Sequence, residues 1–390
     1  MTFKVKTKGQ NEGEKLLVPK LRFKEFNNLY TNKKLSDIAK IVMGQSPDSK
    51  SYTFNTNNTL LIQGNTDLAN GKIKPRIYTS SITKMCTVND IIMTVRAPVG
   101  DLAISQYNAC IGRGVCLIRG TKYLYYYLES YKQRGGWKKI SKGSTIDSIT
   151  SDDLKNININ LPIDIEQIKI SNFITLLDKK IELQKQKIET LKIYKKGLIQ
   201  KVYNQKYNNK IKMKNIIVQK SIRNTKNEIK DIYSVNNKEG FVLQTDQFKD
   251  RIVASEDTTN YKIVKKDYFA YNPARINVGS IARMKHEKIG IISPMYICFE
   301  CKNNVLPEYL EYFFETDIFT YEMKKRLEGS VRMCLSYESM LNIPIDLPDI
   351  MKQKRISKVL NEFDKKINCE EIKYHYQKRL KDGLLQKMFI

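Results

Sequence analysis

Few residues of this chain have the types and spacing that catalysis requires. The sequence has only two histidines, His286 and His375, so its two halves cannot share a histidine mechanism and no His-rich metal cluster can form. Cys298-x-x-Cys301 is a lone pair inside an apolar run, and burial is the favoured interpretation over zinc binding. Asn272-Pro273 is followed by Ala-Arg, whereas amino-methyltransferases hold a flipped base with a Pro-aromatic pair.

Nucleotide-binding motifs are missing as well. The sequence has no Gly-rich loop of the GxGxxG or GxxxxGK type, and Gly112-Arg113-Gly114 alone predicts a turn. The acidic residues show no spacing that indicates a nuclease metal site. We therefore expect a binding protein with no catalytic residues, no metal and no cofactor of its own.

The chemistry that remains is recognition of a polyanion. Lys and Arg number 68 against 41 Asp and Glu, which gives a formal charge of +27 and favours a nucleic acid or acidic protein partners. An AT-rich genome, which favours Lys codons, is an alternative source of part of this excess. The protein has no apolar run that could span a membrane and no signal-peptide core, so we expect it in the cytoplasm, and its seven scattered cysteines favour reduced thiols.

Polar and basic residues gather in the predicted turns, where recognition usually occurs. Arg can bind guanine through two hydrogen bonds, Asn can bind adenine similarly, and Lys mostly contacts phosphate. For each single residue, a structural or solvated role is the alternative. The candidates for DNA contact are Gln45, Lys50, Arg76, Arg96, Arg113, Trp137, Lys138, Arg251, Arg275, Asn277, Arg283, Lys285 and Arg332.

An internal repeat defines the elements that must position these residues. Residues 161–203 return without a gap as residues 347–389, a shift of 186 positions that superimposes Asp178 on Asp364 and Gly197 on Gly383. The repeat predicts a polar N-terminal tail over 1–18, a first recognition domain over 19–160, a long helix over 161–204, a second recognition domain over 205–346 and a second long helix over 347–390.

Both repeated segments have the apolar seam of a coiled coil. In the first, positions 170, 174, 177, 181, 184, 188, 191, 195, 198 and 202 are apolar except for Gln184 and Lys195. The second seam is interrupted at the equivalent Glu370 and, among others, at Lys381. We expect these four polar residues to fix the helix register or to dock a partner. Each helix should begin just after its Leu-Pro, and the two helices should pair antiparallel within the chain, with an approximate two-fold axis between the halves. Packing of each helix on its own domain or on another subunit is the alternative.

The domains between the helices have the pattern of mixed structure. Short strands are predicted at 59–62, 90–95 and 116–118 in the first domain and at 290–292 and 296–299 in the second, with helices at 123–128 and 307–314. The predicted fold class is thus α+β, with two α+β domains separated by two long helices in an antiparallel intramolecular coiled coil, pseudo-two-fold symmetric.

This arrangement resembles the specificity subunit of type I restriction-modification enzymes. Residues that carry the resemblance are Pro19-Lys20-Leu21-Arg22-Phe23, Leu35-Ser36-Asp37-Ile38-Ala39, the Leu-Pro pairs at 161 and 347, Gln167/Gln353, and the final segment from Gly383 to Phe389. The resemblance implies two target-recognition domains, each of which reads one half of a bipartite, non-palindromic site in double-stranded DNA, and helices that set the spacing and dock two modification subunits.

The resemblance also implies that the chain is not an enzyme. Methyl transfer from S-adenosylmethionine to adenine would belong to the modification subunits, and ATP- and Mg-dependent translocation and cleavage to the restriction subunits of the full complex. A non-catalytic coiled-coil adaptor for acidic proteins is the main alternative. A fused methyltransferase-nuclease fragment is a second alternative, which the missing cofactor motifs disfavour.

Overall fold

The structure is a computed structural model that describes residues 3–5, 18–140, 148–237, 239–247, 257–329 and 333–390. The chain forms two compact units. The first comprises Met1–Lys185 and Ile372–Ile390, and the second comprises Gln186–Glu371. The two long helices, α5 (Asp164–Tyr203) and α10 (Ile350–Met388), therefore contribute one segment to each unit.

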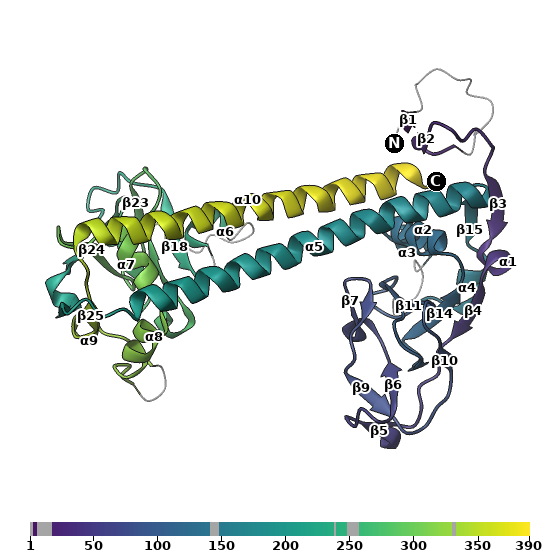
Figure 1. The fold of residues 1–390 in the computed structure, drawn as a ribbon, viewed down its shortest axis with the longest axis horizontal. Coiled ribbons are helices and arrows are strands. Elements are labelled where there is room, and N and C mark those ends of the chain that lie inside the picture. Colours follow the sequence, from purple (N-terminus) through teal and green to yellow (C-terminus); the bar gives the residue numbers. More distant parts are fainter. Residues whose placement is uncertain (1–2, 6–17, 141–147, 238, 248–256, 330–332) are drawn as a thin grey trace. The chain divides into compact units, whose positions relative to one another are not determined.

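The first unit is a mixed α+β structure (Figure 1). Besides its helix segments it contains β1 (Phe3–Val5), β2 (Leu21–Phe23), β3 (Thr31–Lys34), α1 (Leu35–Ile38), β4 (Lys40–Met43), β5 (Tyr52–Thr53), β6 (Thr59–Ile62), β7 (Leu68–Ala69), β8 (Lys72–Ile73), β9 (Ile77–Thr79), β10 (Met85–Cys86), β11 (Ile91–Thr94), β12 (Leu102–Ile104), β13 (Ala109–Ile111), β14 (Val115–Arg119), α2 (Lys122–Gln133), α3 (Gly136–Ile140), α4 (Ser151–Lys155) and β15 (Asn158–Leu161).

The second unit repeats this scheme with fewer strands. It contains β16 (Lys210–Lys212), β17 (Ile217–Lys220), β18 (Ile232–Asn236), β19 (Gly240–Leu243), α6 (Gln244–Gln247), β20 (Lys262–Val264), β21 (Phe269–Tyr271), β22 (Ile281–Arg283), β23 (Gly290–Ile292), β24 (Ile297–Cys301), α7 (Pro307–Phe313), α8 (Asp317–Lys324), α9 (Tyr337–Leu341) and β25 (Pro344–Asp346).

The two units share one sheet topology. In the first sheet the order β4-β14-β11-β12 corresponds to β17-β24-β21-β22, and in the second β10-β13-β6-β9 corresponds to β20-β23-β18-β19. The one parallel pair in each second-sheet set is also equivalent, β6 with β13 and β18 with β23. Two different sequences thus build the same two-sheet framework.

Each unit has three layers, which are the helices, the first sheet and the second sheet. Side chains along the central strands of the first sheet alternate between the two neighbouring layers. In β11, Ile91 and Met93 belong to the core under the helices, whereas Ile92 faces the second sheet. In β21, Phe269 and Tyr271 face the helices and Ala270 the second sheet. Because successive strand side chains point to opposite faces, a strand between two layers is apolar throughout. The predicted α+β class is confirmed.

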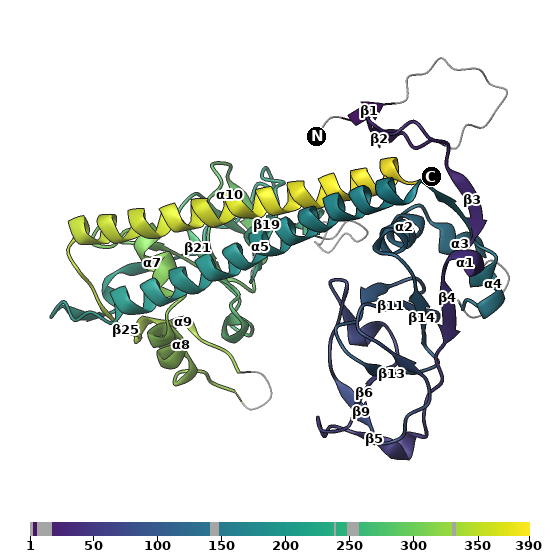
Figure 2. The ribbon, with the colours of Figure 1, turned by 45° about the vertical axis from the view of Figure 1, so that its right-hand side comes forward.

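A tyrosine-rich helix fastens each domain to the long helices of its own unit. Tyr123 and Leu128 of α2 share a core with Ile174 of α5 and Leu385 of α10. In the second unit α7 takes this place, because Tyr309 and Phe313 pack with Tyr203 and Leu360. In Figures 1 and 2 alike, α2 and α7 each lie against the long helices. The long helices are therefore part of both domain cores.

The predicted seams are the buried faces of the long helices. Every seam position from 170 to 202 on α5 and from 356 to 388 on α10 is buried or partly buried. The helices begin at Asp164 and Ile350, just after the two Leu-Pro pairs. Each start is braced alike, because the Nε2 atoms of Gln167 and Gln353 donate to the carbonyl oxygens of Pro162 and Pro348 at 2.9 and 2.8 Å.

Within the second unit, ion pairs show that the helix segments run antiparallel. Lys187 on α5 pairs with Glu370 on α10 at 3.0 Å, and Lys195, farther along α5, pairs with the earlier Asp364 at 2.8 Å. In the first unit Asp178 and Lys381 make the equivalent contact at 2.8 Å. The predicted antiparallel pairing is confirmed in each unit.

No helix in the described part of the chain combines the length and the apolar character that crossing a membrane requires. The predicted burial of Cys298 is confirmed, since its side chain is fully enclosed in β24. Cys301 at the end of β24 is partly buried.

Candidate nucleic-acid interface

Four loops of the first unit converge at the ends of the central strands. Backbone amides of Gln45, Gly112 and Val95 donate to the carbonyl oxygens of Ile111, Ile62 and Gly114 at 2.8 to 3.0 Å. These bonds connect the loops at 44–46, 63–64, 95–96 and 112–114. We call this set of loops the first loop cluster.

Glycine is required where these backbones meet. A Cβ atom on Gly44 would lie 2.1 Å from the carbonyl oxygen of Gly112, and one on Gly114 would lie 2.1 Å from that of Gln63. Any side chain at either position would push the loops apart. The Gly112-Arg113-Gly114 motif is therefore a packing device that exposes the intervening arginine.

Three of the predicted contact residues meet on the first loop cluster. Gln45, Arg96 and Arg113 are all exposed. The amide of Arg113 donates to the hydroxyl of Ser46 at 3.1 Å, which leaves the guanidinium to project from a fixed backbone. Lys50 is exposed just beyond Gln45 on the same loop. An exposed amide and two arginines on rigid loops form a surface suited to base edges and phosphates.

Arg76 has a different environment. Its Nε donates to the carboxylate of Asp67 at 2.9 Å, and the other oxygen of Asp67 accepts from the amides of Gln63 and Gly64. Asp67 is almost fully buried, whereas the side chain of Arg76 is 45% exposed. Arg76 therefore braces the first loop cluster and still reaches solvent.

Trp137 does not lie on the surface. Its side chain is 4% exposed, its ring stacks edge-on against Tyr131 at 4.8 Å, and a Cβ on Gly100 would collide with the indole. A ring enclosed in this way has no face for a base, so the structure gives Trp137 a packing role. Its neighbour Lys138 is exposed.

The second unit presents an equivalent loop. The amide of Leu335 donates to the carbonyl of Pro273 at 3.1 Å, as the amide of Ile149 donates to Val95 at 2.9 Å in the first unit. The segment after Pro273 folds on itself, and it exposes Arg275 and Asn277. These two predicted residues thus occupy in the second unit the region that Arg96 occupies in the first.

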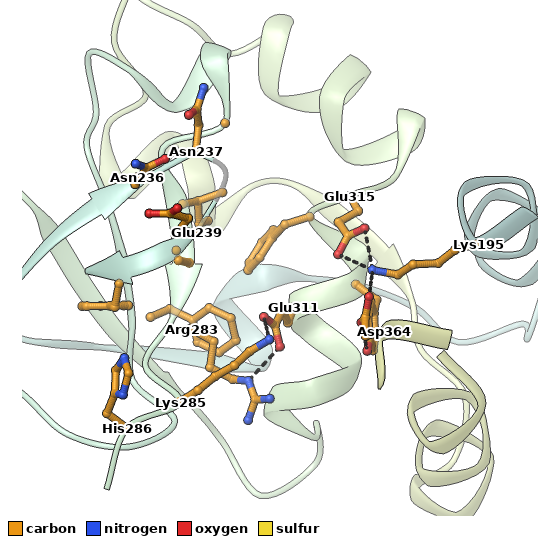
Figure 3. Close-up of a pocket in the computed structure, with 18 residues that line it drawn as sticks. Lys195, Asn236, Asn237, Glu239, Arg283, Lys285, His286, Glu311, Glu315 and Asp364 are labelled. Atoms are coloured by element: carbon orange, nitrogen blue, oxygen red, sulfur yellow. Dashed lines mark hydrogen bonds and ion pairs between the residues drawn. The ribbon is translucent and has the colours of Figure 1, made fainter. Parts of the chain in front are cut away.

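Arg283 and Lys285 line a cavity of about 720 Å³ in the second unit, together with residues of β18, β19 and α7 (Figure 3). Arg283 is 11% exposed and contacts the carboxylates of Asp267, Glu308 and Glu311 at 2.6, 3.0 and 3.0 Å. Lys285 pairs with Glu311 at 2.8 Å. These contacts compensate the charge of Arg283, so we assign it a structural role in place of the predicted contact with DNA.

Lys195 lies at the opposite wall of this cavity (Figure 3). Its ammonium bonds to Asp364 of α10 at 2.8 Å and to Glu315 at 3.3 Å, and it sits 4.9 Å above the ring of Tyr312. The hydroxyl of Tyr312 donates to Asp364 at 2.7 Å. One lysine thus joins both long helices to the recognition domain of its unit.

The same cluster recurs in the first unit, displaced by the repeat. Lys381 bonds to Asp178 of α5 at 2.8 Å and to Glu129 at 2.9 Å, and lies 5.7 Å from the ring of Tyr126. The hydroxyl of Tyr126 donates to Asp178 at 2.8 Å. We call these two sets the lysine clusters.

Burial governs the ionisation of both lysine clusters. Burial opposes the charge of Lys195 and Lys381, but the attraction of their carboxylates outweighs it and raises the pKa of each ammonium. Burial also raises the pKa of Glu129 and Glu315, against the pull of the lysines. The lysines stay charged, and their removal would leave buried carboxylates unpaired.

The partners of the two lysines were missed by sequence reasoning. Tyr126 and Glu129 stand 186 positions before Tyr312 and Glu315, the shift of the helix repeat. The matching segments are short, KYLYYYLES at 122–130 and EYLEYFFET at 308–316, and they lie outside the uninterrupted repeat. Extending the register to these helices would have found them.

Two of the remaining predicted residues lie on the seams of the long helices. Glu370 is buried and pairs with Lys187, and Gln184 is partly buried on the seam of α5. Arg251 and Arg332 lie outside the described residues. Among the residues that the structure does describe, no group of three or more His, Cys, Asp or Glu could hold a metal ion.

Comparison with known proteins agrees with this arrangement. The family model of the type I restriction modification DNA specificity domain matches residues 27–193. A putative type I restriction enzyme MjaX specificity subunit from Methanocaldococcus jannaschii is 34% identical over 166 residues, or 41% of this chain and 39% of that protein. The type I restriction enzyme MjaIX specificity subunit of the same organism is 29% identical over 174 residues, or 41% and 40%. The matched segment thus spans about two fifths of each relative.

Solved structures extend the likeness to the whole fold. The S subunit of a type I restriction-modification system from M. genitalium matches with a TM-score of 0.59 at 18% identity, over 96% of this chain and 99% of that one. A chain from work on complex assembly and conformational transition of the type I R-M system matches with a TM-score of 0.57 at 14% identity, over 92% and 97%. The resemblance predicted from the sequence is confirmed.

Proposed function

We propose that this chain, whose residues 27–193 match the family model of the type I restriction modification DNA specificity domain, is the DNA-specificity subunit of a type I restriction-modification complex. In this proposal each domain reads one half of a bipartite, non-palindromic target in double-stranded DNA. The chain is non-catalytic and acts in the cytoplasm, where it directs the partner subunits to the sites they modify.

One observation carries the proposal. The two domains share the order of four strands in each of their two sheets, yet the loops at the ends of their central strands differ in sequence. Gln45, Arg96 and Arg113 stand on the first loop cluster, and Arg275 and Asn277 stand on the equivalent loop of the second unit. One framework with two different sets of exposed polar side chains is what reading two unlike half-sites requires.

The long helices provide the docking sites for the other subunits of the proposed complex. Their solvent-facing sides offer two related surfaces, on which two modification subunits dock. These subunits would bind S-adenosylmethionine and methylate adenine, and restriction subunits of the full complex would use ATP and Mg. The excess of 27 positive charges favours the approach of DNA.

Selection from random duplex DNA tests this function. The full chain, in complex with its modification subunit, should enrich a split motif whose two halves have different sequences. The variant Gln45→Ala/Arg113→Ala should relax one half only, and Arg275→Ala/Asn277→Ala the other, each lost contact with a base costing about 1–3 kcal/mol of discrimination.

Two results would contradict the proposal. Enrichment of no motif by a soluble, assembled complex would favour the adaptor function, in which charge alone attracts acidic proteins. Relaxation of both half-sites by one pair of substitutions would refute the assignment of one half-site to each domain. Lys20→Ala, a substitution at an exposed lysine outside both loop regions, serves as the control.

A further inference from the structure

The second unit carries an open apolar groove beside the start of α10. It has a volume of about 570 Å³ and lies between the two long helices. Leu198 and Val202 of α5 form one wall, and Ile356, Val359 and Leu360 of α10 form the other. Val359 is 50% exposed. The charged residues Asp349, Lys352 and Arg355 also line it.

The repeat identifies the equivalent surface of the first unit, and there it is covered. A shift of 186 residues places Glu166 at Lys352, Lys169 at Arg355 and Phe173 at Val359. The strands β1 and β2 pair antiparallel and lie on this part of α5. Phe3 and Phe23 stack on each other at 4.9 Å and contact the ring of Phe173 at 5.6 and 5.8 Å.

An ion pair holds the β1–β2 segment, which we call the cover, on α5. The guanidinium of Arg22 bonds to both carboxylate oxygens of Glu166 at 2.8 and 2.6 Å, and both side chains are buried. Lys169 pairs with Glu25 and lies 5.0 Å from the ring of Phe23. The cover therefore combines aromatic rings with charges complementary to those of the helix.

The seam residues beside this surface are more deeply buried in the first unit than in the second. Ile170 is 2% exposed and Met388 is 1% exposed in the first unit, whereas their equivalents Ile356 and Val202 are only partly buried. No described residue covers Val359 in the way that β1 and β2 cover Phe173. Among the described residues, the second unit therefore has the apolar groove but no equivalent of the β1–β2 segment.

We propose that this groove binds a polypeptide segment of a protein partner that carries aromatic side chains and a carboxylate. The first unit shows that aromatic rings on an extended segment fit this helix surface. The charge at one position is reversed, because Lys352 stands where Glu166 accepts Arg22, so an acidic side chain replaces the arginine in the partner segment.

The same reversal argues against a second copy of this chain. The β1–β2 segment of another copy would bring Arg22 against Lys352, and like charges there oppose binding. The inference does not depend on DNA reading, and its test contains no DNA.

Binding of a labelled peptide to the full-length protein, measured by fluorescence anisotropy, tests the inference. The probes are the native segment Pro19–Tyr30 and the same peptide with Arg22→Glu. The Arg22→Glu peptide should bind about three- to fivefold more tightly than the native one, the range of a solvent-exposed ion pair. The protein variant Lys352→Glu should reverse this preference, and Val359→Arg should abolish binding of both peptides.

Ile165→Arg provides the matched control, because Ile165 is 70% exposed at the start of α5 and outside the groove. Binding to this variant should equal binding to the native protein. Saturable binding of neither peptide, or a preference that Lys352→Glu leaves unchanged, would overturn the inference. Tighter binding of the native peptide would overturn it too, and would indicate exchange of β1 and β2 between copies.

Discussion

Lys195 and Lys381 interrupt apolar seams, and their contacts explain why a charge is present there. Each bonds to an aspartate of the other long helix and to a glutamate of the domain in its unit. A leucine could fill the seam but could not connect three elements at once. A polar residue in a seam selects register at some cost in stability. We therefore propose a register role for both lysines.

Replacement of Lys381 by Leu should lower the free energy of unfolding by about 2–4 kcal/mol. A broken buried ion pair costs about 3–5 kcal/mol, and the 36% exposure of Asp178 reduces this value. Urea denaturation of the full chain measures the change. Lys192→Leu, which removes an ion pair with 48% and 38% exposed partners, is the control and should cost about 1 kcal/mol or less.

The loss in free energy of unfolding caused by Lys381→Leu should depend on pH. Burial already raises the pKa of Glu129 above its ordinary 4.5, and loss of Lys381 raises it further. An acid with a raised folded pKa loses stability as pH rises through that pKa, because ionisation is costlier in the folded state. The difference from the native protein should thus be smaller at pH 5 than at pH 7.5. An equal deficit at both values would contradict a role for the unpaired carboxylate.

Single residues show how far sequence reasoning can reach. Turn position correctly indicated exposure for Gln45, Arg113 and Arg275, because loops between buried strands must face solvent. It was wrong for Trp137, which Tyr131 and Gly100 enclose. The role of Arg283 was equally hidden, because two of its three carboxylates come from α7, a separate element that only the fold brings close.

At the scale of elements, periodicity predicted the long helices best. The seam gave their buried faces, and Leu-Pro gave their starts to within a few residues. Longer apolar runs such as Thr59–Ile62 and Gly290–Ile292 were predicted as strands with the observed bounds. Two-residue strands such as β5 and β8 are too short to show an alternation of apolar and polar residues, so they could not be predicted. They form because the fold brings them beside neighbouring strands. The cover formed by β1 and β2 was not foreseen, because it depends on an ion pair between residues 22 and 166.

The long helices should act as a spacer between the half-sites. Duplication of residues 179–185 in α5 and of 365–371 in α10 inserts one heptad in each helix at the residue boundary of the two units, and so preserves the seam. Seven residues add about 10 Å of helix. The spacer in the recognised DNA should lengthen by about three base pairs at about 3.4 Å each, with both half-sites unchanged, as read by selection from random DNA.

The place of the insertion matters. An insertion after Gly197 would separate Lys195 from Ile199 and Tyr203, which are buried in the core of the second unit. Insertion of the heptad into α5 alone is the control, because it misaligns the antiparallel seam and should abolish assembly. An unchanged DNA spacer in the double-insertion variant would refute the spacer role.

For the whole molecule, duplication is the organising feature. The same sheet order, the same tyrosine-rich helix and the same lysine cluster occur in each unit. Two departures from the duplication are informative, the different exposed loops and the groove beside α10. We interpret the loops as the source of target choice and the groove as a second point of contact with a partner.

The most direct test of the central claim is sequencing of adenine methylation in DNA from cells that express this chain with its modification subunit. Cells with the modification subunit alone provide the comparison. The proposed function predicts a split motif with two unlike halves that is methylated only when the chain is present. Methylation that is independent of the chain, or a palindromic motif without a spacer, would contradict it.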